Sequence, residues 1–197
     1  MLLYNNQLSG NCYKVRLLLA HLGIQYEKRE VDVFERAHRD ELLGELNPAL
    51  RVPTVVLDDG RALAESNAIL FYFAGGTEYL PEDSYERAQV LQWLFFEQYS
   101  HEPYIAVARF WTLASITPSR SELEEKLRGG KAALKALDHH LQEREFLVGE
   151  RYSIADIALY AYTHVAPEGR FDLHPYGAVN AWLERVAGQP GHVALDE

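Results

Sequence analysis

The sequence contains few of the residues that mark several large classes of protein. It has one cysteine in 197 residues, so no disulfide can form within the chain, and no cysteine and histidine residues have the spacing of a zinc site. The net charge of −10 argues against a nucleic-acid-binding protein, which usually has a basic surface, and against binding to an anionic membrane. No apolar run approaches the ~20 residues that cross a bilayer.

These absences also indicate where the protein works. A chain with a single cysteine suits a reducing compartment, and its start, MLLYNN, lacks the basic and apolar regions of a secretory signal. We therefore expect a cytoplasmic protein that binds no metal, nucleic acid or membrane. The apolar share of 48% is sufficient for one large core or two small ones.

Residues 1–76 alternate between strand and helix patterns. We expect strands at 2–4, 25–33, 54–57 and 62–63. We expect helices from Asn11 to a terminating Gly23, at 39–46, and from Ser66, as N-cap, to the glycines at 75 and 76. The resulting order, βαβαββα, predicts an α/β domain in which helices cover a compact sheet.

The second half of the chain has a different pattern. Residues 77–83 are acidic and contain Pro81, which indicates a linker. From Ser84 to residue 197 the sequence predicts an all-α domain, beginning with one long helix that carries Trp93, Tyr104 and Trp111. Ser153 and Asp156 have the spacing of a capping box at a later helix, and a last helix is expected at 176–187.

The first predicted helix begins with residues that suit thiol chemistry. Ser9, Asn11 and Cys12 lie at or just before its N-terminus, where unpaired N–H groups stabilise anions such as thiolates. A hydroxyl or amide there can donate a hydrogen bond to sulfur. The alternatives are that Ser9 only caps the helix and that Cys12 is a small buried residue.

Two further segments suit a peptide-like ligand. A cis Val52–Pro53 bond would turn the Val52 backbone outward, where it can pair with an extended ligand as an added strand does. Ser66 and the first N–H groups of the third helix can bind a carboxylate, and Glu65 suits an ammonium group. Taken singly, each segment has a simpler interpretation. Pro53 can be an ordinary trans proline at a strand edge, and Ser66 can be an N-cap beside a solvated Glu65.

Together, in this order, the motifs resemble the cytosolic glutathione transferase family. The resemblance covers nearly the whole chain, and its most specific parts are NPALRVPTVVLDDGRALAESNAILFYF and YSIADIALY. It implies a thioredoxin-like N-terminal domain, an all-helical second domain and a homodimer. It also implies that glutathione is the co-substrate.

The resemblance implies a role for specific residues. Val52, before Pro53, would pair with the cysteinyl part of glutathione, and Glu65 and Ser66 would hold its γ-glutamyl group. His38 and Arg51 stand where theta-like members hold the glycine carboxylate, although His38 also fits a solvated loop. The electrophile pocket is expected between the domains, with Tyr104, Arg109 and Trp111 in its wall; packing in the helix core is the alternative for Trp111.

The thiolate-stabilising position differs among family members. Theta-like enzymes have a serine where Ser9 stands, and a bacterial group that often reduces disulfides has an asparagine where Asn11 stands, so both remain candidates. Compared with the Cys-x-x-Cys of thioredoxins, this chain has serine at the attacking position, and only Cys12 remains. We expect a glutathione transferase acting in detoxification; the alternatives are a glutathione-dependent disulfide reductase and a non-catalytic binding protein on the same fold.

Overall fold

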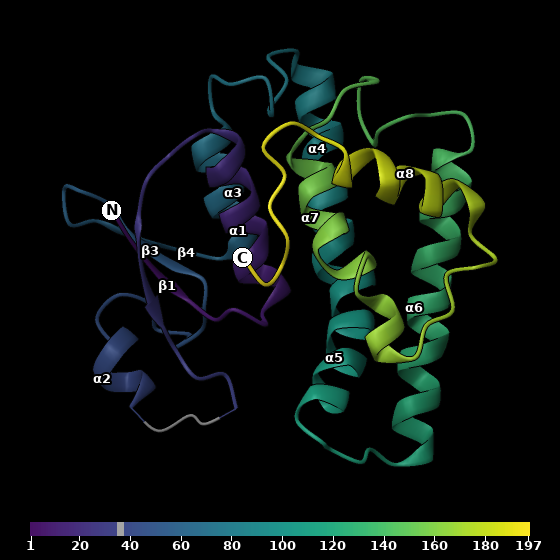
Figure 1. Ribbon diagram of the computed structural model, residues 1–197, viewed down its shortest axis with the longest axis horizontal. Coiled ribbons are helices and arrows are strands. Elements are labelled where there is room, and N and C mark those ends of the chain that lie inside the picture. Colours follow the sequence, from purple (N-terminus) through teal and green to yellow (C-terminus); the bar gives the residue numbers. More distant parts are fainter. Residues whose placement is uncertain (35–37) are drawn as a thin grey trace. The chain divides into compact units, whose positions relative to one another are not determined.

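The computed structural model describes residues 1–34 and 38–197, which divide into two compact units (Figure 1). The first unit comprises Met1–Gly75 and Pro190–Glu197, and the second comprises Gly76–Gln189. Residues 190–197, expected in the helical domain, therefore belong to the first unit, and residues 77–83, expected as a linker, belong to the second. The predicted fold class is confirmed: a sheet with helices in the first unit, and helices in the second.

The described residues of the first unit form a four-stranded mixed sheet in the order β2-β1-β3-β4. Strand β1 pairs in parallel with β2, and β3 runs antiparallel to both β1 and β4. Strand β2 is an exposed edge strand and is shorter than the expected 25–33. The strands are β1 (Leu2–Asn5), β2 (Glu27–Glu30), β3 (Thr54–Val56) and β4 (Ala62–Ala64).

Helices cover both faces of this sheet because successive side chains of a strand point to opposite faces. On one face, Leu3 and Val55 pack with residues of α1 (Gly10–His21) and α3 (Ser66–Ala74). On the other, Tyr4 packs with Leu43 of α2 (Arg39–Leu43). Helices α1 and α3 lie side by side on their face (Figure 1), which brings the polar residues of the two helices within reach of each other.

The ends of these helices follow local rules, with one correction. Helix α1 ends as predicted at Gly23, whose positive φ of 64° lets Ile24 N–H donate to Leu19 C=O, as in a Schellman motif. Helix α3 is not capped by Ser66, as expected from the sequence: Glu65 is its N-cap, with φ of 66°, and Ser66 is its first helical residue. The Ser66 hydroxyl bonds to another helix instead, because the left-handed backbone at Glu65 shifts the helix start by one residue.

The second unit consists of helices, and the long helix expected after Ser84 is interrupted. A π-helical segment lies between two α-helices, just before Pro103, whose ring cannot accommodate regular i→i−4 hydrogen bonding. The elements are α4 (Ser84–Phe96), the π-helical η1 (Glu97–His101), α5 (Glu102–Leu113), α6 (Arg120–Leu141), α7 (Ile154–Thr163), the 3₁₀ turn η2 (Ala166–Gly169) and α8 (Gly177–Ala187).

Two glycines in α6 allow close packing of the helices. A Cβ atom at Gly129 would lie 2.3 Å from the ring of Tyr104 on α5, and one at Gly130 would lie 2.3 Å from the ring of Phe171. No larger residue fits at either position without displacing an aromatic ring. The glycines thus lower the helix propensity of α6 but permit α5 and α6 to pack directly.

The capping box predicted at Ser153 and Asp156 is present and fully buried at the start of α7. The Asp156 carboxylate accepts hydrogen bonds from Ser153 N and Oγ, from Leu147 N at 3.0 Å and from Trp182 Nε1 at 2.9 Å. Burial raises the pKa of Asp156 to about 6, and these hydrogen bonds oppose the rise. One carboxylate therefore joins α7, α8 and the preceding loop.

We predict that Asp156→Ala lowers the free energy of unfolding by about 3 kcal/mol or more, because it removes a cap and leaves buried donors without an acceptor. Chemical denaturation monitored by circular dichroism measures this loss. Glu122→Ala is the matched control, since Glu122 has the same place in the exposed capping box of α6. It should cost much less than Asp156→Ala, because the Glu122 carboxylate is exposed to water and its partners can hydrogen-bond to water instead. Equal losses for the two variants would contradict the role assigned to Asp156.

Candidate functional site

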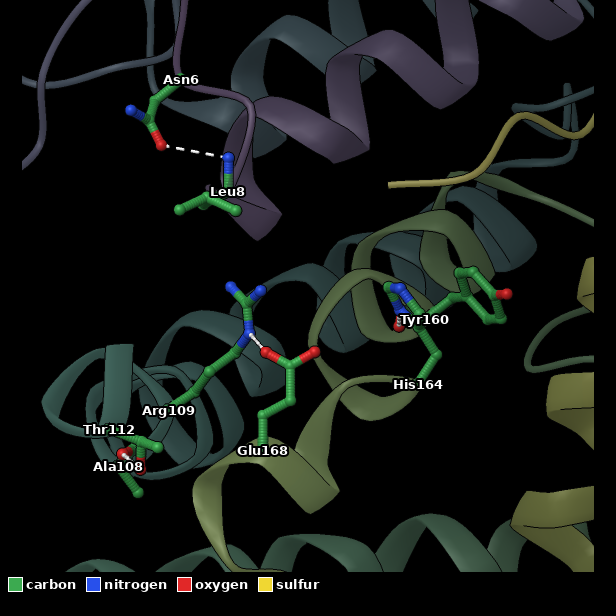
Figure 2. A network of polar contacts seen from close by, with 8 residues as sticks. All are labelled: Asn6, Leu8, Ala108, Arg109, Thr112, Tyr160, His164 and Glu168. Carbon is green, nitrogen blue, oxygen red and sulfur yellow. Dashed lines mark hydrogen bonds and ion pairs between the residues drawn. The ribbon is translucent and has the colours of Figure 1, made fainter. Parts of the chain in front are cut away.

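The loop after β1 fixes Ser9 at the N-terminus of α1. The Ser9 hydroxyl accepts a hydrogen bond from Cys12 N at 3.3 Å, so Ser9 is the N-cap. Asn6 shapes the loop: its Oδ1 accepts from Leu8 N at 3.1 Å (Figure 2), and its carbonyl accepts from Ser9 N at 3.1 Å. The Ser9 side chain also lowers the pKa of the Cys12 thiol through a hydrogen bond, so the hydroxyl contacts both the backbone and the side chain of Cys12. These contacts fix the hydroxyl at the N-terminus of α1.

The structure brings two of the predicted residues together across α1 and α3. Ser66 Oγ donates to Asn11 Oδ1 at 3.1 Å, although the two residues are 55 positions apart in the chain. The Asn11 oxygen therefore faces Ser66, and only its amide nitrogen is a donor that can serve a thiolate. The N-termini of the two helices, each with partial positive charge, are joined through this contact.

Lys14 is a third member of this group that sequence reasoning missed. Its side chain is fully buried, and its ammonium donates to Ser66 Oγ at 3.3 Å and to Asn67 Oδ1 at 3.4 Å. The apolar periodicity of α1 runs through Val15 and Leu18, so a lysine beside it is expected to be solvated. No signal within the local sequence reveals its burial, because the partners of Lys14 come from α3.

Cys12 is buried in the first turn of α1 and accepts a hydrogen bond from Asn6 N at 3.3 Å. Burial raises the pKa of the Cys12 thiol to about 11, and the hydrogen bonds from Asn6 and Ser9 oppose the rise. The thiol is therefore neutral and shielded at neutral pH. Such a group is a poor nucleophile, since the thiolate is the reactive form.

The segment around Pro53 is ordered by a buried asparagine. The Val52–Pro53 peptide bond is cis, and Pro53 is buried. Asn47 Nδ2 donates to the Arg51 carbonyl at 2.9 Å and to Thr54 Oγ1 at 3.1 Å, and Thr54 Oγ1 donates to the same carbonyl at 2.9 Å. Asn47 thus holds the backbone on both sides of Val52, a role that its position before Pro48 did not reveal.

His38 and Arg51, the residues expected at the glycine end of the ligand, are exposed. The described contact of the His38 side chain is with Glu41 Oε2 at 3.3 Å, and His38 has a left-handed φ of 65°. Glu65 is also exposed and left-handed, at the start of α3. A positive φ at a residue other than glycine is costly and is often found at functional positions.

The three residues expected in an electrophile pocket all lie on α5, but they have different surroundings. Arg109 Nε forms an ion pair with Glu168 Oε2 at 2.7 Å, with the Arg109 side chain only 4% exposed (Figure 2). The Tyr104 ring packs against Gly129 of α6, with Lys126 Nζ 5.4 Å from its centre. Trp111 is half-buried. Their place in a pocket wall stays a prediction.

The same part of the second unit contains a pair of stacked rings. The rings of Tyr160 and His164, one turn apart on α7 and its C-cap, lie 4.6 Å apart at an angle of 5° (Figure 2). His164 Nδ1 lies 2.8 Å from the Tyr160 carbonyl, and Thr112 Oγ1 of α5 donates to the Ala108 carbonyl at 3.3 Å. These contacts stabilise local helix geometry.

Comparison with known proteins identifies the family. Residues 8–75 match the glutathione S-transferase N-terminal domain, and residues 88–190 match the glutathione S-transferase C-terminal domain. The chain belongs to the glutathione S-transferase family. The first matched region falls within the first unit, and the second lies in the second unit except for its last residue, Pro190.

Several known proteins are similar to this chain over almost its full length. The crystal structure of a glutathione S-transferase from Pseudomonas fluorescens Pf-5 is 48% identical, with a TM-score of 0.96 over 100% of this chain and 98% of that chain. The disulfide-bond oxidoreductase YfcG of Escherichia coli is 31% identical over 91% of this chain and 87% of YfcG. Glutathione S-transferase 2 of Anopheles gambiae is 31% identical over 93% and 88% of the respective chains.

Two further features of the described residues concern membranes and metal ions. Within residues 1–34 and 38–197, no helix has the length and apolar character needed to cross a membrane. No group of three or more histidine, cysteine, aspartate or glutamate residues in the same part of the chain is arranged to hold a metal ion.

We predict that Cys12 of the folded protein reacts slowly with iodoacetamide at pH 7.5, because a thiol with a pKa near 11 is ionised to about one part in a thousand or less. Mass spectrometry of timed samples measures the labelling, and the protein unfolded in denaturant is the control, which should be labelled at the rate of an ordinary thiol. Rapid stoichiometric labelling of the folded protein would show that Cys12 is accessible and reactive.

Proposed function

We propose that the protein is a glutathione transferase that binds glutathione at the N-termini of α1 and α3 and activates its thiol for attack on small hydrophobic electrophiles. The observation that carries this proposal is the Ser9 hydroxyl, which is held at the N-cap of α1 beside the first N–H groups of that helix. The family membership of both units supports it.

The chemistry requires a thiolate at neutral pH. A free thiol has a pKa of about 8.5, and each unit of lowering requires about 1.4 kcal/mol of preferential stabilisation of the anion. A charge-assisted hydrogen bond from Ser9 and the positive end of α1 supply a stabilisation of this order. The thiolate then attacks the carbon that bears the leaving group, a carbon–sulfur bond forms, and the leaving group departs with its electron pair.

The two candidate donors differ in what they can offer to sulfur. Asn11 Oδ1 is engaged by Ser66, which orients the Asn11 side chain toward α3. The Ser9 hydroxyl is fixed at the start of α1 by Cys12 N, at the positive end of the helix dipole. We therefore assign thiolate stabilisation to Ser9, and to Asn11 the positioning of Ser66 with a secondary contribution through its amide.

The remaining parts of glutathione are assigned to the residues already described. The first N–H groups of α3 and Ser66 receive the γ-glutamyl carboxylate, with the buried ammonium of Lys14 behind them. Glu65 receives the α-ammonium group. The Val52 backbone, beside Pro53, pairs with the cysteinyl unit, and Arg51 and His38 hold the glycine carboxylate.

The proposal includes a homodimer located in the cytoplasm. Exposed aromatic side chains on and just after α4 support self-association, since large apolar side chains on a surface often mark an interface. Phe95 is 68% exposed and Tyr99 is 83% exposed. Tyr104, Arg109 and Trp111 are assigned to the binding of the electrophile.

A second candidate function is glutathione-dependent disulfide reduction. It is favoured by the similarity to YfcG, named as a disulfide-bond oxidoreductase, and by Asn11. Since Cys12 is buried with a raised pKa, the attacking sulfur is that of glutathione. The glutathione thiolate forms a mixed disulfide and releases one thiolate; a second glutathione then releases the other thiol and leaves as glutathione disulfide, so that two thiols are oxidised as one disulfide is reduced.

We expect Ser9→Asp to raise the pKa of bound glutathione and to lower the rate of conjugation to 1-chloro-2,4-dinitrobenzene at neutral pH by about tenfold or more. Aspartate still caps α1, but as an anion it has no proton to donate to the sulfur. Ser9→Thr, which keeps both hydroxyl and cap, is the matched control and should stay within about threefold of the wild-type rate. Asn11→Ala should lower the rate less than Ser9→Asp.

Full activity and an unchanged thiol pKa in Ser9→Asp would overturn the assignment of Ser9. Titration calorimetry of the unmodified protein with glutathione tests whether glutathione binds at all, which is the step before catalysis. An absence of binding at millimolar glutathione would favour a non-catalytic binding protein on this fold.

A comparison of kcat/KM on 1-chloro-2,4-dinitrobenzene and on bis(2-hydroxyethyl) disulfide, each with glutathione, distinguishes the two enzymatic functions. We expect Cys12→Ala to retain both activities within about twofold, because a buried neutral thiol takes no part in either reaction. A selective loss of disulfide turnover in Cys12→Ala would show that the protein's own sulfur participates.

A further inference from the structure

The C-terminal segment Pro190–Glu197 returns to the first unit and is held there through its backbone carbonyls. Tyr13 Oη also lies 3.4 Å from the side-chain Nε2 of His192, and five further contacts join a side chain to a main-chain oxygen of this segment. They are His21 Nδ1 with Pro190 at 2.9 Å, Tyr13 Oη with Val193 at 2.7 Å, Gln7 Nε2 with Leu195 at 2.9 Å, Arg16 Nη2 with Leu195 at 2.6 Å and Lys28 Nζ with Glu197 at 3.4 Å.

Arg16 connects this segment to the loop that precedes Ser9. The side chain lies on α1 and is only 3% exposed. Besides the Leu195 carbonyl, its guanidinium donates to Asn5 Oδ1 at the end of β1, at 2.8 Å, and to two carbonyls of the loop that follows, Asn6 at 3.4 Å and Gln7 at 3.2 Å. A planar group with several fixed donors thus sets the positions of the loop backbone and of the C-terminal segment together.

The Asn6 carbonyl relays this constraint to Ser9. The same oxygen that accepts from Arg16 also accepts from Ser9 N at 3.1 Å. The Asn6 backbone N–H donates to Cys12 Sγ in the first turn of α1. A shift of Asn6 would therefore move the Ser9 backbone relative to the helix whose N-terminus it caps.

Leu195 completes the set of partners of Arg16. Its carbonyl accepts from both Arg16 Nη2 and Gln7 Nε2, and the Gln7 carbonyl accepts from Arg16 as well. Arg16, Gln7 and Leu195 are therefore each hydrogen-bonded to the other two. Without Leu195, Arg16 Nη2 loses one of its two carbonyl acceptors, and the Gln7 side chain loses its contact with the C-terminal segment.

We infer that Arg16, anchored by the Leu195 carbonyl, is a positioning residue that holds the Ser9 hydroxyl in the geometry needed to stabilise the glutathione thiolate. This inference rests on the proposed function. Displacement of a catalytic group by about 1 Å can lower a rate by about a hundredfold, so a constraint on the loop before Ser9 has a direct effect on activation. The parts of glutathione remote from its sulfur are held by α3 and Val52, which Arg16 does not contact.

The experiment separates thiol activation from ligand binding in three variants. Arg16→Lys keeps a cation but not the planar fork, and a chain ending at Gly191 removes Leu195 while leaving Arg16 intact. Lys28→Ala is the matched control. It also removes a contact with the C-terminal segment, at Glu197, but Lys28 lies on β2 and not in the group formed by Arg16, Gln7 and Leu195. The pKa of bound glutathione is taken from the pH dependence of kcat/KM, and the affinity for S-methylglutathione, which has no ionisable thiol, from calorimetry.

We expect Arg16→Lys and the shortened chain each to raise the pKa of bound glutathione by about one unit and to lower the rate at neutral pH by about tenfold. S-methylglutathione should bind to both within about twofold of wild type, which also shows that both are folded, and Lys28→Ala should be unchanged in both measurements. An unchanged pKa in the shortened chain, or an equal loss of affinity for S-methylglutathione, would overturn the positioning role. If the unmodified protein does not bind glutathione, the proposed function fails instead.

Discussion

The candidate site depends on the packing of α1 beside α3 on one face of the sheet, and on the hydrogen bond from Ser66 to Asn11 that joins their first turns. Strand alternation directs Leu3 and Val55 to this face, and the apolar faces of the two helices cover them. The two helix N-termini then share one polar cluster with partial positive charge, and the buried ammonium of Lys14 lies in it. An anionic ligand that meets one helix terminus therefore meets the other as well.

Both units use a buried polar group to organise backbone far from it in sequence. In the first unit, Arg16 holds the loop after β1 and the C-terminal segment, and Asn47 holds the backbone around Val52. In the second, Asp156 joins the start of α7 to Trp182 of α8. Such groups are costly to bury, but each has its hydrogen-bonding capacity used by specific partners, so they favour one arrangement over others. These polar groups fix the geometry of the loops rather than enlarge the buried apolar surface.

Much of the fold could be predicted because it depends on local pattern. The order βαβαββα, the end of α1 at Gly23, the β3–β4 hairpin and the capping box of α7 all follow from turn residues, caps and periodicity within short windows. Of the three differences that follow, the first has a local cause and the other two depend on distant parts of the chain. Ser66 looked like a cap because serine usually is one, yet the left-handed backbone at Glu65 shifts the start of α3. The burial of Lys14 and the attachment of residues 190–197 to the first unit depend on partners distant in the chain.

The sequence by itself determined which groups are present: a hydroxyl, an amide and a thiol at the start of one helix, and a family pattern over nearly the whole chain. Only the tertiary structure decided what each can do. Ser66 turns the Asn11 oxygen toward α3 from 55 residues away, the core buries Cys12 and raises its pKa to about 11, and Leu195 meets Arg16 across 179 residues. Hydrogen-bond availability and burial are properties of the folded neighbourhood, so the distinction between Ser9, Asn11 and Cys12 arises only when these distant segments meet.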